Sequence, residues 1–362
     1  MALDENYIVE RFTLEDKDIP TLAKLLTGAF QEDEAAKEDG AVADLRDENF
    51  KLIFGAPSVD KEIFVRARYK PTNEIVGFLG SILKSLSIDG KIYKVSLPAW
   101  LSVHHKHRRK GLGKALGTKL LEVVKERGYD GGIYFHDATQ HGLETSSAVA
   151  RDAGLPMVEI MMMKRFIVRG YDVDEAAKAI KVGPLMKAGF KLFERIGKVK
   201  GNNIRLYKPE DIDRVHKLSV ELAERNQFSM VQVYEDLKWK LADPQVICVV
   251  CEDENGKVKG FINAWEFLLS GFGNNVLFGW LDTIHIDHLT KQEAKDLANF
   301  LGHEATKRGW KGLQSPYIPY FNSKPLKRAN FLFFPKKVGL YLLNITGIPI
   351  PKKIDSVYIE WR

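Results

Sequence analysis

The sequence is poor in cysteine, with only Cys248 and Cys251 among its 362 residues. Their C-x-x-C spacing invites a zinc or redox site, but the segment around them is rich in β-branched residues and is typical of a strand. Positions three apart on a strand face opposite sides of the sheet, so the two thiols would point away from each other. No second C-x-x-C follows. The sequence therefore predicts two ordinary strand cysteines and no metal site.

Long apolar runs are also missing. No run approaches the roughly 18 apolar residues that a membrane-spanning helix needs. The opening stretch, M-A-L-D-E-N-Y-I-V-E-R-F, is polar and acidic, unlike a secretory signal peptide. These absences predict a cytoplasmic protein without a membrane span.

A dense run of one charge is the third absence. The chain carries 54 Lys and Arg against 48 Asp and Glu, a formal net charge of +6, with the acidic residues spread throughout. Nucleic-acid-binding proteins concentrate basic residues on one face, so nucleic acid is not an expected partner. The mild positive balance is consistent with an anionic small-molecule ligand. At this length, and with 45% hydrophobic residues, the chain has room for two domains with sizeable cores.

What the sequence does contain is a basic, glycine-containing turn between a strand and an amphipathic helix. The strand Val95–Val103 is followed by the turn His104–Gly113 and by a helix that runs to about Arg127, with leucines at helical spacing. Gly111 and Gly113 let the backbone approach a ligand closely, and the first helical N–H groups have no internal partners. With the helix dipole and three consecutive cations beside it, the turn is suited to a phosphate or pyrophosphate.

The pattern Arg108-x-x-Gly111-x-Gly113 resembles the R/Q-x-x-G-x-G/A motif of the GNAT acyltransferase superfamily. The strand before the turn and the helix after it are also features of that family. The resemblance implies that backbone amides of the loop hold the pyrophosphate of acetyl-CoA or another acyl-CoA. The positions that it marks as coenzyme-binding are Leu101, Val103, Arg108, Arg109, Lys110, Gly111, Leu112, Gly113 and Lys114.

The second half of the chain repeats the pattern of the first. The strand Val276–Ile286 and the helix Lys291–Arg308 repeat the strand and helix that flank the basic turn. Where the first copy has Arg108–Gly113, the second has Asp287–Gln292, with neither a glycine pair nor a cationic run. We therefore expect one coenzyme site, in the first half. The second half would shape the acceptor site or an interface.

The predicted fold is α/β of the α+β kind, with two tandem GNAT-like domains. Each domain would hold a mixed, largely antiparallel sheet flanked by helices. The predicted boundaries are residues 1–168 for the domain with the acyl-CoA site, 169–203 for a helical linker, and 204–362 for the degenerate second domain. Val158–Val168 is expected to close the first sheet, and Lys337–Asn344 and Ser356–Trp361 are expected as the closing strands of the second.

Local residues also resemble the N-myristoyltransferases, which are two-copy GNAT chains that bind the coenzyme through the first copy. The segment from Trp100 to Lys110 resembles that family's F-L-C-V-H-K-K-L-R-S-K, and Gly77–Ile82 resembles its G-F-I-S-A-I. Pro98 interrupts the preceding strand and marks a bulge or a break, where amides are left free for a ligand. By the resemblance, the amides of Trp100 and Leu101 would form an oxyanion hole for the thioester.

The base that removes a proton from the amine stays open. In the N-myristoyltransferases a terminal carboxylate reaches the active site as the base, whereas this sequence ends at its last predicted strand, so that role is in doubt here. Other candidates for the base are His136, Asp137, His141 and Asp282. Tyr134 is a weaker candidate for protonating the leaving thiolate.

The predicted reaction moves an acyl group, most simply acetyl, from coenzyme A to the amine of a small molecule or peptide. A long-chain acyltransferase of the myristoyltransferase type is the alternative. Met161–Met163 could line a tunnel for such a chain, although methionine more often fills a core. A non-catalytic acyl-CoA-binding module is the third possibility. The sequence specifies neither the acceptor nor the oligomeric state.

Overall fold

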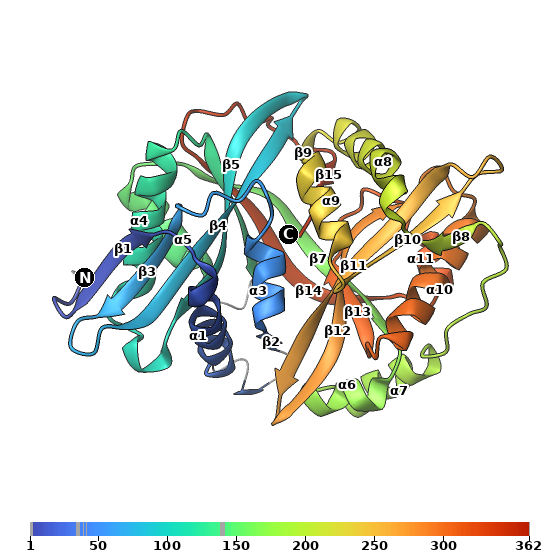
Figure 1. Cartoon of the computed structure of the whole chain (residues 1–362), viewed down its shortest axis with the longest axis horizontal. Coiled ribbons are helices and arrows are strands. Elements are labelled where there is room, and N and C mark those ends of the chain that lie inside the picture. The colour runs from blue at the N-terminus through green and yellow to red at the C-terminus, as the bar shows by residue number, and fades with distance from the viewer. Residues whose placement is uncertain (1–2, 34–36, 39, 41, 138–141, 362) are drawn as a thin grey trace. The chain divides into compact units, whose positions relative to one another are not determined.

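The computed structural model describes residues 3–33, 37–38, 40, 42–137 and 142–361 (Figure 1). Packing divides the chain into two compact units. The first comprises Met1–Glu34, Asp44–Met163 and Lys337–Ile354, and the second comprises Ala35–Ala43, Lys164–Lys336 and Asp355–Arg362. These units are not contiguous in sequence, unlike the predicted domains, because a late segment of the chain belongs with the first unit.

A mainly antiparallel sheet forms the first unit. In spatial order its strands are β1 (Tyr7–Phe12), β3 (Phe64–Tyr69), β4 (Glu74–Ile88), β5 (Lys91–Val103), β6 (Gly131–Asp137) and β14 (Leu332–Asn344). Neighbours run antiparallel except β5 and β6, which are parallel. The helical segments are η1 (Asp16–Asp18), α1 (Ile19–Gln31), α3 (Asp47–Phe54), η2 (His105–His107), α4 (Leu112–Glu126) and α5 (Gly142–Asp152).

Helix α4 forms as the periodicity predicts. Leu112, Leu116 and Leu120 are buried against the sheet, at most 2% exposed, and each such leucine contributes about 2 kcal/mol of burial free energy. The helix ends at Glu126, and Gly128 follows with a φ of 68°, a left-handed angle that glycine adopts without strain. This packing fixes the helix whose N-terminus carries the basic turn.

The second unit repeats this architecture. In spatial order its strands are β8 (Ile204–Leu206), β10 (Val246–Glu252), β11 (Val258–Gly271), β12 (Asn274–His285), β13 (Gly312–Pro316) and the second half of β7 (Met157–Gly170), with β12 and β13 as the parallel pair. Short strands β2 (Val42–Asp44), β9 (Phe228–Val231) and β15 (Val357–Tyr358) lie off this path. The helical segments are α6 (Val173–Ala179), α7 (Pro184–Leu192), η3 (Pro209–Asp211), α8 (Ile212–Glu224), α9 (Tyr234–Ala242), α10 (Lys291–Lys307) and α11 (Lys324–Arg328).

The last strand of each sequence repeat pairs with a strand of the other repeat. Strand β6 pairs along its whole length with β14, whereas the end of β7 pairs with β13. The predicted strands over Val158–Val168 and Lys337–Asn344 both exist. Lys337–Asn344 lies in the first unit, so the prediction that it closes the second sheet is wrong, whereas Val158–Val168 is divided, with residues up to Met163 in the first unit and Phe166–Val168 paired with β13. Apolar patterning marks a segment as a strand but does not name its partner, which tertiary packing chooses.

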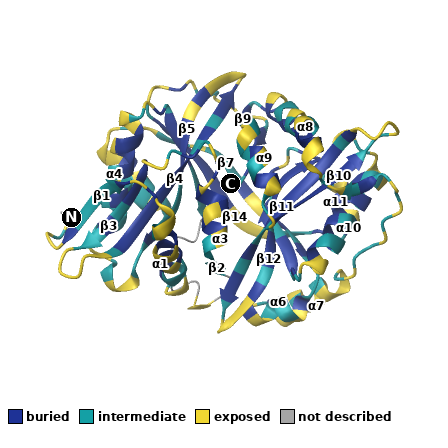
Figure 2. Ribbon diagram, viewed as in Figure 1, coloured by how far each residue is buried: buried dark blue, intermediate teal, exposed yellow. Residues whose placement is uncertain are grey.

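The predicted fold class is confirmed, since both units hold a largely antiparallel sheet with helices on it. Buried residues follow the strands, and exposed residues gather on the outer faces of the helices (Figure 2). Among the described residues, no helix combines the length and apolar character required to cross a bilayer.

Candidate functional site

The basic turn leaves the N-terminus of α4 without a side-chain cap. Gly111 is the N-cap residue, and its backbone is left-handed, with φ 79° and ψ 1°. Because glycine has no side chain, the N-cap position supplies no hydrogen bond to the N–H groups of the first helical turn. A Cβ on Gly111 would meet no atom within 4 Å, so the backbone angle is what calls for glycine there. Arg109 is left-handed too, at φ 62°. An uncapped helix N-terminus after such a turn is typical of sites that bind anions through backbone N–H groups.

The side chain of Arg108 stabilises the turn through hydrogen bonds to backbone carbonyl groups. Its guanidinium donates hydrogen bonds to the carbonyl oxygens of Val103 (3.3 Å) and Glu32 (3.4 Å), and also to that of Ala29. These acceptors tie the end of α1 to the junction of β5 and the turn. Arg109 and Lys110 are exposed instead, so they are the cations of the run that a ligand would meet first.

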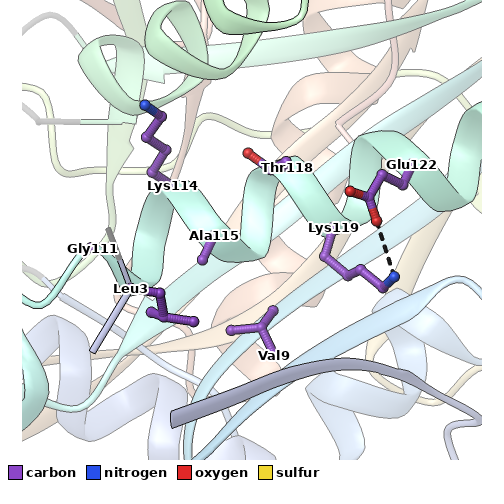
Figure 3. Close-up of a pocket in the computed structure, with 8 residues that line it drawn as sticks. All are labelled: Leu3, Val9, Gly111, Lys114, Ala115, Thr118, Lys119 and Glu122. Carbon is purple, nitrogen blue, oxygen red and sulfur yellow. Dashed lines mark hydrogen bonds and ion pairs between the residues drawn. The ribbon is translucent and has the colours of Figure 1, made fainter. Parts of the chain in front are cut away.

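A shallow depression of about 300 Å³ runs from this turn along the outer face of α4 (Figure 3). Residues of α4 line most of it, and Leu3 of the N-terminal segment and Val9 of β1 line the other side. Lys114 also borders it, and its ammonium pairs with Asp152 of α5. Further lining residues are Gly111, Ala115, Thr118, Lys119 and Glu122.

Strand β5 carries a bulge at Trp100. The pairing of β4 with β5 shifts register between Phe78 and Gly80, which leaves Trp100 and Leu101 without residues directly opposite them. Trp100 has a φ of 64°, a left-handed angle that costs a residue with a side chain about 1–2 kcal/mol. The predicted bulge is therefore present, two residues beyond Pro98, which pairs in register. Strain of this kind in a strand often marks a functional position.

Strands β5 and β6 separate beside this bulge. Their register pairs are Val95 with Gly131 and Ser96 with Gly132. Beyond those pairs both strands continue, and Trp100 and His136 each lie four residues further along. Since parallel strands that stop pairing leave main-chain groups unshared, the opening between them can accept an extended ligand.

His136 lies near the end of β6 with its ring partly buried. Burial lowers the pKa of His136 to about 4, so the imidazole is neutral near pH 7. Its Nε2 is buried and has no hydrogen-bond partner among the described residues. The ring stacks on Tyr134, with centroids 5.7 Å apart, and lies 5.7 Å from Tyr341. The ring is thus neutral with a nitrogen available to a ligand, and its low pKa makes it a weak base near pH 7.

Asp137, Tyr134 and His141 are the other residues of the first half that the sequence suggested for proton transfer. Asp137 ends β6, half-buried, in register with Val338 of β14. Burial raises the pKa of Tyr134 well above its usual value, so this hydroxyl stays protonated. His141 lies outside the described residues.

The corresponding turn of the second unit is closed to an anion. Thr290 caps α10, where its hydroxyl accepts a hydrogen bond from the N–H of Glu293 (3.2 Å) and the Glu293 side chain bonds back. The helix end that is open at Gly111 is thus satisfied here by side chains. This contrast supports the expectation of one coenzyme site, in the first half.

Asp282 is part of a buried ion network in the second unit. Its Oδ2 lies 2.6 Å from the ammonium of Lys240, and its Oδ1 accepts a hydrogen bond from the N–H of Trp361 (2.9 Å). Lys240 also lies 3.3 Å from Glu360. A buried carboxylate with these partners is better suited to stabilising the fold than to accepting a proton from a substrate. Sequence reasoning missed Lys240, since only the fold brings it near Asp282.

The two cysteines lie buried on β10, as predicted for a strand. Burial raises the pKa of the Cys251 thiol to about 12, which keeps it protonated and unreactive. Leu101 and Val103 contribute side chains to the core beneath α4, so any contact of theirs with a ligand would come from the backbone.

Comparisons with known proteins agree with the site's geometry. Residues 12–134 match the acetyltransferase (GNAT) domain family. The glycylpeptide N-tetradecanoyltransferase of Plasmodium falciparum is 24% identical over 226 residues, which is 61% of this chain. That match spans about half, 51%, of the relative's own length.

Solved structures show a similar fold. Saccharomyces cerevisiae N-myristoyltransferase with bound myristoyl-CoA superposes with a TM-score of 0.77 at 17% identity, over 95% of this chain and 80% of that one. A conserved protein of unknown function from Enterococcus faecalis, described as a probable N-acyltransferase, superposes with a TM-score of 0.51 at 11% identity, over 92% of this chain and 71% of that one.

Proposed function

Because residues 12–134 match the acetyltransferase (GNAT) domain family, we propose that this chain transfers a long-chain acyl group from coenzyme A to the amine of a peptide. The observation that carries the proposal is the uncapped N-terminus of α4 behind Gly111. A helix end of this kind binds pyrophosphate through backbone N–H groups, and the exposed Arg109 and Lys110 add positive charge.

The coenzyme would continue from that turn into the opening between β5 and β6. The thioester would then lie near the bulge, where the amides of Trp100 and Leu101 can donate to the oxygen that becomes negative. The amine attacks the thioester carbon, the C–S bond breaks, and the coenzyme leaves as a thiolate, which takes up the proton that the amine gives up. The amine loses a proton in forming the amide, and the neutral His136 is the candidate on β6 to accept it.

The length of the transferred acyl chain is what distinguishes this proposal from the acetyl transfer expected from the sequence. The curated relatives are tetradecanoyltransferases, and the superposed yeast structures hold myristoyl-CoA. Both observations favour the long-chain alternative over acetyl-CoA. Met163 is buried and Met161 and Met162 are half-buried, so flexible apolar side chains are available in this region of β7.

Calorimetry on the whole chain tests the coenzyme site. We expect myristoyl-CoA to bind more tightly than acetyl-CoA, and Gly111→Glu to weaken myristoyl-CoA binding at least tenfold by placing an anion at the mouth of α4. Gly128→Glu is the matched control, because Gly128 is also left-handed with open space around its Cβ position but lies at the other end of the same helix. Equal loss in both variants, or in neither, contradicts the site.

Mass spectrometry with a peptide that begins with glycine tests the reaction. We expect the peptide to gain one tetradecanoyl group and to release free coenzyme A. Tight binding of myristoyl-CoA without any product would support the non-catalytic module instead. Faster turnover with acetyl-CoA than with myristoyl-CoA would contradict the long-chain proposal and favour acetyl transfer.

A further inference from the structure

Three side chains that could bind a metal converge in the second unit. Glu221 lies in the last turn of α8, His285 ends β12, and His288 follows in the turn before α10. One ligand atom from each lies within 4.8 Å of the others. They come from two segments more than 60 residues apart in sequence, which α8 brings together by packing on β11 and β12.

The buried, unpartnered ring of His285 is the observation that points to a ligand. The residue is fully buried, at 0% exposed, and neither ring nitrogen has a hydrogen-bond partner among the described residues. Its ring is held parallel to Phe261, with an interplanar angle of 10° and centroids 5.9 Å apart. A buried polar group without a partner costs about 1–3 kcal/mol, so the pair of unpartnered nitrogens requires an explanation.

The other two groups give the cluster an open side. His288 Nε2 lies 3.2 Å from Oε2 of Glu221, and their side chains are 49% and 30% exposed. Arg214 lies 3.4 Å from the second oxygen, Oε1, so Oε2 is the one that faces the histidines. Zinc ligands at about 2.0–2.2 Å in a tetrahedron stand about 3.3–3.6 Å apart, and the His288–Glu221 pair at 3.2 Å is close to that separation.

We propose that Glu221, His285 and His288 bind a divalent transition metal of the zinc class. Two imidazoles and a carboxylate suit zinc, and the exposed side leaves a fourth position for water. The ion would partner one of the two ring nitrogens of His285 and tie α8 to the turn after β12. That turn is the second copy's counterpart of the basic coenzyme turn, so the duplicated position carries a metal where the first copy carries an anion.

The test is metal binding by the untagged whole chain after chelation and dialysis. We expect about one equivalent of Zn²⁺ by calorimetry, and a visible absorption band of a low-symmetry site when Co²⁺ is added. His288→Ala removes an exposed ligand that the fold does not need, so it should weaken Zn²⁺ binding at least tenfold and abolish the Co²⁺ band. Glu221→Gln should weaken binding as well.

His105→Gln is the matched control. His105 is exposed in the histidine-rich turn of the first unit, where His104 stacks on it at 4.4 Å, so adventitious Zn²⁺ would bind there. Zinc should also raise the melting temperature of the wild type and of His105→Gln, but not that of His288→Ala. Binding that His105→Gln removes, binding that His288→Ala leaves intact, or no Co²⁺ band in the wild type each overturns the proposal.

Discussion

The ammonium of Lys240 lies 2.6 Å from Oδ2 of Asp282, and both side chains are almost completely buried. Glu360 shares the same ammonium at 3.3 Å, so one cation offsets two carboxylates that belong to different parts of the second unit. Buried charges depend on their partners, because each alone would carry a large desolvation penalty.

Replacing Lys240 with Met should therefore strongly destabilise the second unit. The change removes the ammonium that both buried carboxylates share, and we expect a loss of about 3–5 kcal/mol in its free energy of unfolding. Urea denaturation followed by tryptophan fluorescence measures it, since Trp361 and Trp280 lie beside the network. Lys307→Met is the control, because the Lys307 side chain is exposed and its ion pair with Glu304, within one helix, contributes little. Equal losses in both variants would contradict the assignment.

His136 should make stability depend on pH. Burial lowers the pKa of His136 to about 4, while an unfolded histidine has a pKa of about 6.5. Between those values the unfolded chain takes up a proton that the folded chain does not, so stability falls as the pH drops through this window, by up to about 3 kcal/mol. Comparing urea midpoints of the wild type and His136→Gln at pH 7.0, 5.5 and 4.5 isolates this part. Parallel pH profiles would show that the ring is not buried in solution.

Two substitutions at Trp100 separate the backbone angle of the bulge from the side chain. Trp100→Gly and Trp100→Val both lose the edge-to-face contact with Phe30, at 5.8 Å, but only glycine accepts a φ of 64° without strain. We expect Trp100→Val to be less stable by about 1–2 kcal/mol and to lose at least tenfold more kcat. Chemical denaturation and steady-state kinetics on the two variants give the comparison. If both behave alike, the bulge does not orient catalytic amides.

Adjacent arginines in the basic turn should give different phenotypes. Arg108→Met removes hydrogen bonds to three carbonyl oxygens and should cost about 1–3 kcal/mol of stability. Arg109→Met should leave stability unchanged and weaken acyl-CoA binding severalfold, with a smaller dependence on salt than in the wild type. Thermal melts and calorimetry at two salt concentrations measure these effects. The reverse pattern would mean that Arg108 is the ligand-binding cation.

Much of the site could be predicted because its signals are local. The glycine in the basic turn, the leucine spacing of α4 and the proline before the bulge all lie within a few tens of residues of one another. The angles at Gly111 and Trp100 agree with those signals. Helix caps and bulges depend on short stretches of backbone, which is why sequence reasoning reaches them.

What could not be predicted depends on distant partners. Arg108 reads as a free cation in the sequence, yet its acceptors include carbonyls of α1 more than 70 residues away. Asp282 reads as a possible base until the fold brings Lys240 to it. Nothing in the spacing of Glu221 and His285 suggests that they meet. Side-chain partners of this kind follow from tertiary packing, which residue spacing does not encode.

The pairing of β6 with β14 has a consequence for the order in which the chain can fold during synthesis. The first unit needs Val338–Asn344, and these residues are made more than 200 positions after the strand that they pair with. A nascent chain that has emerged only as far as Asp137 therefore exposes an unpaired strand edge, which is a site for aggregation. The two halves, although duplicated, depend on each other for completion, and neither can finish its sheet as a separate translation product.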